Sequence, residues 1–311
     1  MSIDHPFGRP LVIANPVAGT GRAPVLPRLR AALDGLGLGY DVEVTGGPGH
    51  ATHLAHTAVV EAGRRYLIVV GGDGTIHEVV NGIVDASAGT VLGDDPILGV
   101  VSAGSGSDLV RTFGLDRSPE VLARHFLSEA TTPMDLGRVE HLDQRGKLRW
   151  SAFANVAQIG FGGRVVGTAA KLPRRLGRSR YGIGIVAAWG GFRRERTTVV
   201  VDGGELTEEL CNVVVANGQF FGGGMRVAPR ALPDDGLFSV QSWGGTVGDV
   251  LRASKQLRRG SHLQRPDVRE WRSAAVEVRS ERPLVLEADG EVLGHGPARF
   301  EVMHRALRFK L

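Results

Sequence analysis

The sequence Val69-Val70-Gly71-Gly72-Asp73-Gly74-Thr75-Ile76-His77-Glu78 marks the point at which a strand turns abruptly into a helix. An apolar run from Tyr66 predicts a buried strand, and apolar residues that recur at helical spacing from Ile76 predict the helix. Thr75 and Glu78 match the capping-box pattern, so we expect the helix to begin near Thr75. The glycines would let several backbone N–H groups converge at the positive end of the helix dipole. This stretch is therefore a candidate phosphate cradle.

Asp73 lies inside the cradle and changes its interpretation. A carboxylate repels a bare phosphate, but it can bind, directly or through water, the magnesium ion that accompanies a nucleotide. Asp73 is therefore a candidate metal-binding residue. The alternative at this level is a Gly-Asp-Gly surface turn that caps an ordinary helix.

The same alternation of strand and loop recurs through the first part of the chain. It predicts a parallel α/β sheet, in which ligands bind outside the carboxyl ends of the strands. Asn15, Thr45, Asp73 and Ser105 each follow an expected strand, so we expect them along one edge of that sheet. The expected strands and helices are Leu11–Ala14, Val25–Leu36, Tyr40–Val44, His50–Ala62, Tyr66–Val70 and Ile97–Val101.

The pattern becomes rich in β-strands after an interruption at Ala130–Pro133. We therefore expect an α/β domain over residues 1–132, followed by a mainly antiparallel β-sandwich domain over residues 133–311. Asp-Gly pairs in the second domain predict hairpin turns. The expected long strand, helices and turns of this domain include Trp150–Gly160, Tyr181–Phe192, Asp202–Gly204, Val247–Arg259 and Asp289–Gly290.

Composition limits the class of protein. The chain has 311 residues, 42% of them hydrophobic and 23% charged, which is ordinary for a soluble globular protein. The single cysteine, Cys211, excludes an internal disulfide and suggests a buried thiol in a reducing compartment. The N-terminus lacks the apolar core of a signal peptide, and no apolar stretch approaches the length of a membrane span. We expect a cytoplasmic protein.

The formal net charge is only +4, yet basic residues cluster in Lys171–Arg180, Arg193–Arg196 and Arg252–Arg259. Such clusters could contact nucleic acid, anionic lipid head groups or nucleotide phosphates. For each cluster taken alone, a solvated surface is the commoner explanation.

Taken together, the motifs resemble those of the diacylglycerol kinase catalytic-domain family, specifically the bacterial lipid kinases related to sphingosine kinases. They occur in the same order over nearly the whole chain. The matching residues are Asn15-Pro16 with Gly19 and Gly21, Gly71–Thr75 with His77-Glu78, Gly104–Asp108, Asp135–Gly137, Asn217-Gly218 with Gly222–Gly224, Pro229 through Asp235–Leu237, and Asp289–Glu291.

The resemblance implies an ATP-dependent kinase that phosphorylates a lipid hydroxyl, with ATP on the first domain and the lipid substrate on the second. Asp289 corresponds to the proposed general base, with Glu291 as its neighbour, and Asp73 assists catalysis with Mg²⁺. A structural Mg²⁺ would be held by Asp235 and by the main-chain carbonyls of Leu232 and Leu237. The residues implied to contact ATP are Asn15, Thr45, Gly71, Gly72, Asp73, Gly74, Thr75 and Ser105.

Two features depart from the family pattern. Ser107 occupies a position where the bacterial members commonly have asparagine, which leaves its role open. Some members also have a C-terminal extension that returns to the first domain, whereas this chain stops at Leu311 soon after its last expected strand. We therefore expect weaker bracing between the domains.

Two other classes remain open on the sequence. A NAD kinase would share the Gly-Gly-Asp-Gly cradle and the two-domain build, although Gly222–Gly224 and Asp289–Glu291 favour a lipid kinase. A non-catalytic lipid-binding regulatory protein could retain a nucleotide site, although the presence together of Asp73, Asp235 and Asp289 argues against it. The expected partner is a lipid at the membrane surface, with peripheral association, no nucleic acid, and a homodimer left open.

Overall fold

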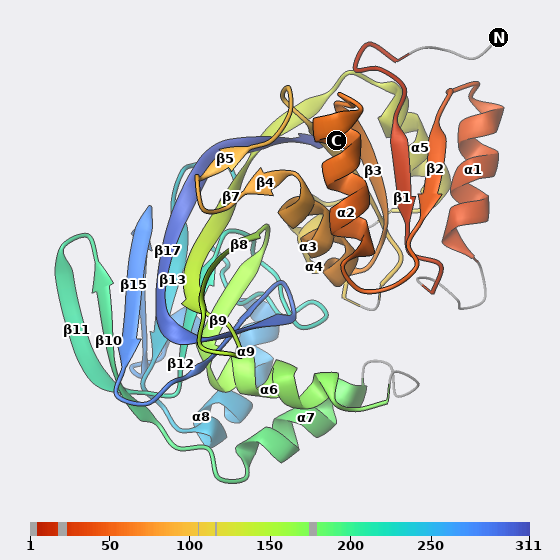
Figure 1. Cartoon of the computed structure of the whole chain (residues 1–311). Coiled ribbons are helices and arrows are strands. Elements are labelled where there is room, and N and C mark those ends of the chain that lie inside the picture. Colours follow the sequence, from red (N-terminus) through yellow and green to blue (C-terminus); the bar gives the residue numbers. More distant parts are fainter. Residues whose placement is uncertain (1–4, 18–23, 105, 116, 174–178) are drawn as a thin grey trace. The chain divides into compact units, whose positions relative to one another are not determined.

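A computed structural model of the chain describes residues 5–17, 24–104, 106–115, 117–173 and 179–311 (Figure 1). The chain divides into two compact units, one formed by Met1–Asp135 with His304–Leu311 and the other by Leu136–Met303. No helix among the described residues is long and apolar enough to cross a membrane. Of the motifs and basic clusters described above, Gly19, Gly21, Ser105 and residues 174–178 lie outside the described ranges.

The first unit is built on a parallel sheet with the strand order β6-β3-β1-β2. Every residue of β1 and β3 is buried, as expected for strands of a parallel sheet that is covered on both faces. Helix α2 packs on α3, and α1 packs on α5. The elements are β1 (Leu11–Ala14), α1 (Val25–Gly35), β2 (Asp41–Val44), α2 (His50–His56), the π-helix Thr57–Glu61, β3 (Tyr66–Gly71), α3 (Asp73–Gly82), β4 (Val84–Asp85), β5 (Thr90–Val91), β6 (Ile97–Ser102), α4 (Asp108–Thr112) and α5 (Pro119–Leu127).

The start of α3 differs from the expected capping box. The helix begins at Asp73 rather than near Thr75, and its N-cap residue is Gly72, which has no side chain to cap it. Glu78 instead accepts hydrogen bonds from Gly49 N (2.9 Å) and Ala51 N (3.1 Å), so its carboxylate caps the neighbouring helix α2. Glu78 thus caps α2 instead of its own helix, because α2 packs against α3 and presents its otherwise unpaired N–H groups to the Glu78 carboxylate.

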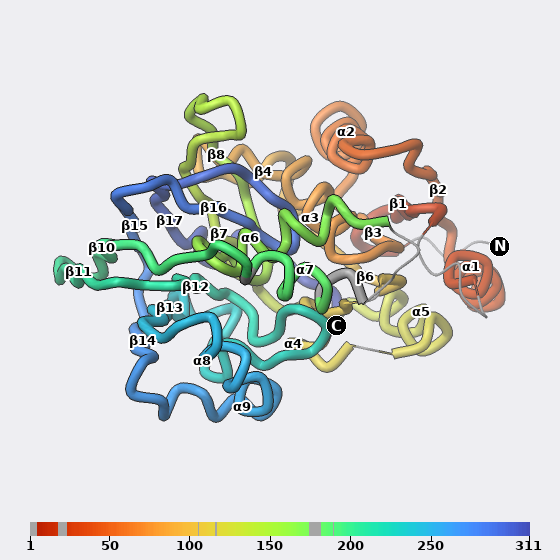
Figure 2. Tube along the Cα trace, turned by 90° about the horizontal axis from the view of Figure 1, so that it is seen from below, coloured from red at the N-terminus to blue at the C-terminus, as the bar shows by residue number. Residues whose placement is uncertain are grey.

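The second unit is mainly antiparallel, with the strand order β14-β13-β12-β9-β16-β17. Phe153, Phe238 and Phe300 form the aromatic centre of its largest apolar core. The β10–β11 hairpin extends from this unit in both views (Figures 1 and 2). The elements are β7 (Thr131–Leu142), β8 (Leu148–Phe153), β9 (Val156–Gly160), α6 (Phe161–Ala170), α7 (Ser179–Trp189), β10 (Glu195–Val201), β11 (Gly204–Leu210), β12 (Asn212–Ala216), β13 (Phe238–Trp243), α8 (Val247–Arg252), α9 (Ser254–Arg259), the 3₁₀-helix His262–Gln264, β14 (Val268–Ser273), β15 (Ala275–Ser280), β16 (Val285–Ala288) and β17 (Glu291–Lys310).

The expected fold class, a parallel α/β domain followed by a mainly antiparallel β-sandwich, is confirmed. Three elements of the second domain differ from the expectation. The strand expected over Trp150–Gly160 is two strands, β8 and β9. The helix expected over Val247–Arg259 is divided at Ala253 into α8 and α9, and α6 was not expected.

The last strand, β17, explains why the units differ from the expected division after residue 132. It pairs with β15 and β16, and its end then pairs with β6, with Arg308 opposite Ile97. The buried Asp135 accepts hydrogen bonds from His304 Nδ1 (2.9 Å) and Arg305 N (2.6 Å). The expectation that this chain lacks a C-terminal segment returning to the first unit is therefore wrong, because a 20-residue strand supplies it.

Candidate functional site

The carboxyl edge of the parallel sheet carries the candidate nucleotide residues. The register places Ala14 beside both Val44 and Val70, so Asn15 and Thr45 follow directly at the same edge as the loop after β3. Gly71 lies opposite Ser102, which brings the loop after β6 to that edge as well. The residues expected to converge therefore do so, apart from Ser105, which lies outside the described residues.

Asn15 joins the first loop to the start of α3. Its Nδ2 donates to Thr75 Oγ1 (3.1 Å), and its Oδ1 accepts from Val17 N (3.1 Å). The next loop is fixed by Thr45 N, which donates to Ala14 O (2.9 Å). These bonds hold two strand-end loops beside the helix N-terminus.

The glycines of the cradle are needed for close approach. Gly72 has φ −91°, so positive φ is not the reason for glycine there. A Cβ on Gly104 would lie 2.6 Å from Gly72 Cα, which no side chain could accommodate without movement of the backbone. The loops after β3 and β6 therefore touch backbone to backbone at the N-terminus of α3.

Asp73 faces a second carboxylate that the sequence reasoning missed. Asp108 is 6% exposed, and its N–H donates to Asp73 Oδ1 (3.3 Å). A Cβ on Gly106 would collide with Asp73 Oδ2 and would lie 3.4 Å from Asp108 Oδ2, so both carboxylates border the same small space. Asp108 belongs to the Gly104–Asp108 motif, which follows an expected strand of the parallel sheet. Its position after that strand was the feature of the sequence that could have identified it.

Two carboxylates bordering one space at a helix N-terminus suit a divalent cation better than a bare anion. No group of three or more His, Cys, Asp or Glu side chains in the described part of the chain could hold a metal by itself. The residues therefore fit a magnesium ion that takes further ligands from water and nucleotide phosphates.

Ser107 occupies a special backbone position beside this pair. Its φ is 59°, in the left-handed region that asparagine adopts more readily than serine. Its hydroxyl is hydrogen-bonded to Ser102 Oγ at 2.6 Å. Serine at position 107 thus adopts the left-handed backbone of the turn, and its hydroxyl ties the turn to the end of β6.

In the second unit, Asp289 is held by backbone amides. Its Oδ2 accepts from Ala154 N (2.9 Å), and its Oδ1 accepts from Asn155 N (2.9 Å) and Val156 N (3.3 Å). These donors lie where the expected long strand is interrupted between β8 and β9. Asp289 has φ 51° and Gly290 has φ 86°, so the expected Asp-Gly turn is present. The turn and the carboxylate are one structural unit.

Two asparagines attach a glycine-rich loop to the break between β8 and β9. Asn155 Nδ2 donates to Phe220 O (2.7 Å), and Asn217 Nδ2 donates to Ala154 O (2.8 Å). The loop then contains Gly222–Gly224, all three with positive φ. Asn155 was missed because nothing in its local sequence marks the break between β8 and β9.

Glu287 is another residue that the sequence reasoning missed. It is 2% exposed, and its carboxylate accepts from Gln158 Nε2 (2.8 Å) and Gly290 N (3.0 Å). Gln158 Oε1 accepts from Asn212 Nδ2 (2.9 Å), and Asn212 Oδ1 accepts from Gly162 N (3.0 Å) at the start of α6. All donors point toward Glu287, so this buried chain of hydrogen bonds ends on its carboxylate.

Burial raises the pKa of Glu287 to about 8, and the donors from Gly290 and Gln158 oppose the shift. The charges of Asp289 and Glu291 raise the pKa further. A charged residue within the otherwise apolar strand β16 was the signal available in the sequence.

The expected metal ligand Asp235 already has a cationic partner. Its Oδ1 accepts from Leu237 N (3.0 Å), and its Oδ2 forms an ion pair with the Arg272 guanidinium. Leu232 is 48% exposed. A cation at Asp235 would have to displace Arg272, so the side chains in their present arrangement do not fit a metal ion. The metal site at Asp235 stays a prediction.

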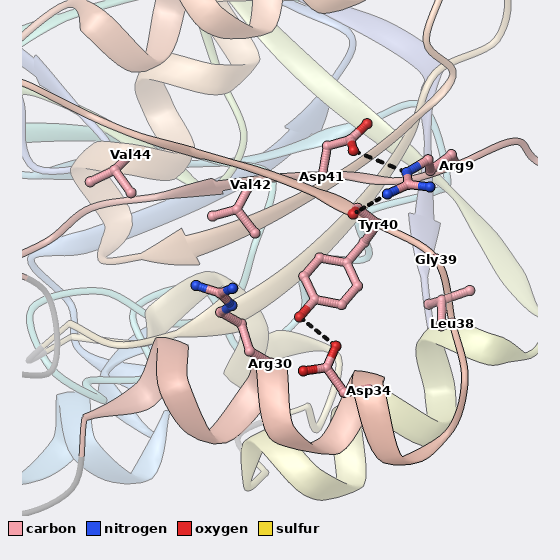
Figure 3. Close-up of a pocket in the computed structure, with 9 residues that line it drawn as sticks. All are labelled: Arg9, Arg30, Asp34, Leu38, Gly39, Tyr40, Asp41, Val42 and Val44. Atoms are coloured by element: carbon pink, nitrogen blue, oxygen red, sulfur yellow. Dashed lines mark hydrogen bonds and ion pairs between the residues drawn. The ribbon is translucent and has the colours of Figure 1, made fainter. Parts of the chain in front are cut away.

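A surface cavity of about 570 Å³ lies elsewhere in the first unit, between α1 and β2 (Figure 3). Its polar groups bind one another: Arg9 Nε donates to Asp41 Oδ1 (3.0 Å), and the Tyr40 hydroxyl donates to Asp34 Oδ1 (2.8 Å). No described residue of the expected site lines it.

Two protein families match the chain. The family described as the diacylglycerol kinase catalytic domain matches residues 9–139. The family described as the YegS C-terminal NAD kinase beta sandwich-like domain matches residues 155–310.

Relatives with curated names resemble almost the whole chain. "Diacylglycerol kinase" from Mycobacterium tuberculosis is 31% identical to this chain, and the alignment covers 98% of this chain and 95% of that protein. "Probable lipid kinase YegS-like" from Chromohalobacter salexigens is 30% identical, over 92% of this chain and 89% of its own. A crystal structure of a diacylglycerol kinase from Bacillus anthracis has a TM-score of 0.69 at 19% identity, over 97% of this chain and 96% of its own, which supports the fold.

Proposed function

This chain belongs to the diacylglycerol kinase catalytic-domain family of lipid kinases, and on that premise we propose that it transfers the γ-phosphoryl group of ATP to a hydroxyl of diacylglycerol or a related lipid. The observation that carries the proposal is the pair of glycine loops touching at the N-terminus of α3, with Asp73 and Asp108 beside them. Helix dipole, N–H groups and carboxylates together suit a nucleotide with its magnesium.

On the donor side, the first unit binds and orients ATP. Asn15 and Thr45 belong to loops fixed against the start of α3, and Gly71–Thr75 supplies the cradle, so these residues would position the phosphates. Asp73, with Asp108, would hold the magnesium ion, which neutralises charge on the phosphates when bound. Because Gly106 leaves room in front of both carboxylates, a side chain there would block this arrangement.

On the acceptor side, Asp289 acts as the general base. The lipid hydroxyl oxygen forms a bond to the γ-phosphorus, the bond from that phosphorus to the bridging oxygen of ADP breaks, and the hydroxyl proton passes to Asp289. The three backbone donors to Asp289 fix its orientation. Glu291, exposed two residues further on, is the alternative base.

A phosphorylation assay tests the proposal. The protein is incubated with labelled ATP, Mg²⁺ and separate acceptors: diacylglycerol, phosphatidylglycerol, a sphingoid base and NAD⁺. We expect label in one or more lipids. Label in NAD⁺ alone would identify a NAD kinase, and ATP binding without transfer to any acceptor would identify a regulatory protein.

The lipid acceptor also implies where the enzyme works. Diacylglycerol resides in membranes, so we propose that the protein associates peripherally with a membrane surface. Basic residues near an anionic surface contribute on the order of 1 kcal/mol each to such binding.

A further inference from the structure

Helices α6 and α7 form an antiparallel hairpin on the second unit. Near the start of α6, Arg164 Nη2 donates to Gly190 O (3.0 Å), just beyond the end of α7. Near the end of α6, Ala169 lies against Gly184, where a Cβ on the glycine would be 3.1 Å from Ala169 Cβ. Ala188, one turn later on α7, is buried in the same interface. Gly184 and Ala188 therefore mark the face of α7 that packs inward.

The opposite face of α7 is apolar and exposed. Val186 is 70% exposed and Ile183 is 43% exposed, and Ala187 beside them is also exposed. Helical spacing places these three residues on one surface, turned away from Gly184 and Ala188. From residue 182 to residue 188 the helix has no charged or polar side chain. A helical stretch that is apolar on all sides is normally buried, whereas this face of α7 is exposed among the residues that the structure describes.

Basic residues flank the apolar face at both ends of the hairpin. Exposed Lys171 follows α6, and exposed Arg193 and Arg194 follow α7. An apolar helical face bordered by Lys and Arg is typical of segments that lie in the head-group region of an anionic bilayer. With 11 residues, α7 is about 16 Å long at 1.5 Å per residue, too short to span a bilayer. The charge pattern therefore favours a membrane surface as the occupant.

The α6–α7 hairpin also lies beside the Asp289–Glu291 turn within the same unit. Helix α6 packs on β16, and a Cβ on Gly167 would be 3.5 Å from Val292 Cγ2. Val292 immediately follows the Asp289–Glu291 turn. Figure 1 shows α7 on the outer side of α6, away from the strands. A membrane that contacted α7 would thus lie close to the turn that carries the proposed base.

We propose that the outer face of α7, defined by Ile183, Val186 and Ala187, inserts into the head-group region of an anionic membrane and delivers the acceptor lipid to the second unit. The proposal rests on the proposed lipid kinase function for its purpose, but the surface itself is defined by exposure and charge. Lys171 and Arg193 contact the lipid phosphates, while the apolar residues enter between the head groups.

Vesicle sedimentation tests this surface. The full chain is mixed with vesicles of phosphatidylcholine containing phosphatidylglycerol, at low and at high salt. We expect Val186→Asp to weaken binding about tenfold or more, because it removes the burial of one aliphatic side chain and adds a charge. Arg193→Glu should weaken binding at low salt, about fivefold for each unit of charge changed, and less at high salt.

Leu148→Asp is the matched control, because Leu148 is an apolar residue of the same unit, 57% exposed at the start of β8. It should bind vesicles like the parent. Since Val186 is mostly exposed, its substitution should leave the melting temperature nearly unchanged, and Ile183→Asp provides a second variant of the same face.

Two outcomes would overturn the inference. Equal vesicle binding by the parent, Val186→Asp and Ile183→Asp would show that α7 does not contact lipid. A parent dimer that becomes monomeric in Val186→Asp, with vesicle binding unchanged, would show that the face is covered by a second copy of the chain. The binding measurement needs no turnover, so it stands apart from the kinase assay: a parent that binds vesicles through α7 but phosphorylates no lipid contradicts the proposed function alone.

Discussion

Asp289→Asn separates the proposed catalytic role of this residue from its structural one. The carboxylate accepts three backbone N–H groups, two through Oδ1 and one, from Ala154, through Oδ2. Asparagine tolerates the left-handed backbone at φ 51°, and its Oδ1 can keep the two donors on that side. Its NH₂ group must then face Ala154 N, so a hydrogen bond to a charged acceptor is lost. Such a loss costs about 1.5–3 kcal/mol.

The stability loss sets how the assay must be run. For a domain of this size it corresponds to a fall in melting temperature of roughly 3–12 °C. Removal of a general base lowers turnover about a hundredfold to ten-thousandfold. We therefore expect lipid phosphorylation per folded molecule, measured well below the melting transition, to fall by at least two orders of magnitude while ATP affinity is retained.

Asp202→Asn is the matched control. Asp202 also opens an Asp-Gly turn of the second unit, with φ 50° followed by Gly203 at φ 77°, and it accepts a hydrogen bond from Ser273 Oγ (2.7 Å). This variant should keep normal turnover. If Asp289→Asn melted lower yet phosphorylated lipid within about threefold of the parent, Asp289 would be a structural residue only. The base would then be sought at Glu291 with Glu291→Gln.

Three further predictions follow from the geometry. Gly72→Val should abolish ATP binding in calorimetry, because even a Cβ there lies 3.3 Å from Gly104 Cα, whereas Gly35→Ala, with nothing within 4 Å, should bind normally. Since the pKa of Glu287 is raised to about 8, its contribution to the unfolding free energy is fully present below the unfolded value near 4.5 and is lost as pH rises through 8. Urea titrations at pH 5.5 and 8.5 should therefore show a smaller change in unfolding free energy for Glu287→Gln than for the parent. An equal change in both proteins would refute the pKa shift. If Mg²⁺ displaces Arg272 at Asp235, it should raise the melting temperature of the parent but not of Asp235→Asn, and equal responses would discard that metal site.

Local sequence identified the elements whose pattern does not depend on distant partners. A parallel α/β domain is predicted by the apolar runs of β1 and β3 and by the glycines that follow β3. Side-chain periodicity and backbone freedom are properties of a short segment, so they can be read without knowledge of distant partners. The Asp289–Gly290 turn was predictable for the same reason.

Other features depend on partners far away in the chain, so no local pattern could reveal them. Glu78 resembles the second half of a capping box, yet it caps α2 because that helix packs against α3. The break between β8 and β9 exists where Asp289, more than a hundred residues later, takes the backbone N–H groups.

The sequence by itself thus determined the fold class, the glycine loop after β3 and the order of the motifs, since these follow from periodicity, glycine and local turn chemistry. Only the tertiary structure decided that Asp108 faces Asp73, that Glu287 is a buried acceptor behind the Asp289 turn, and that α7 presents an apolar face outward. Burial, pKa and exposure arise from what surrounds a side chain in three dimensions, and those surroundings are assembled from segments that are distant in sequence.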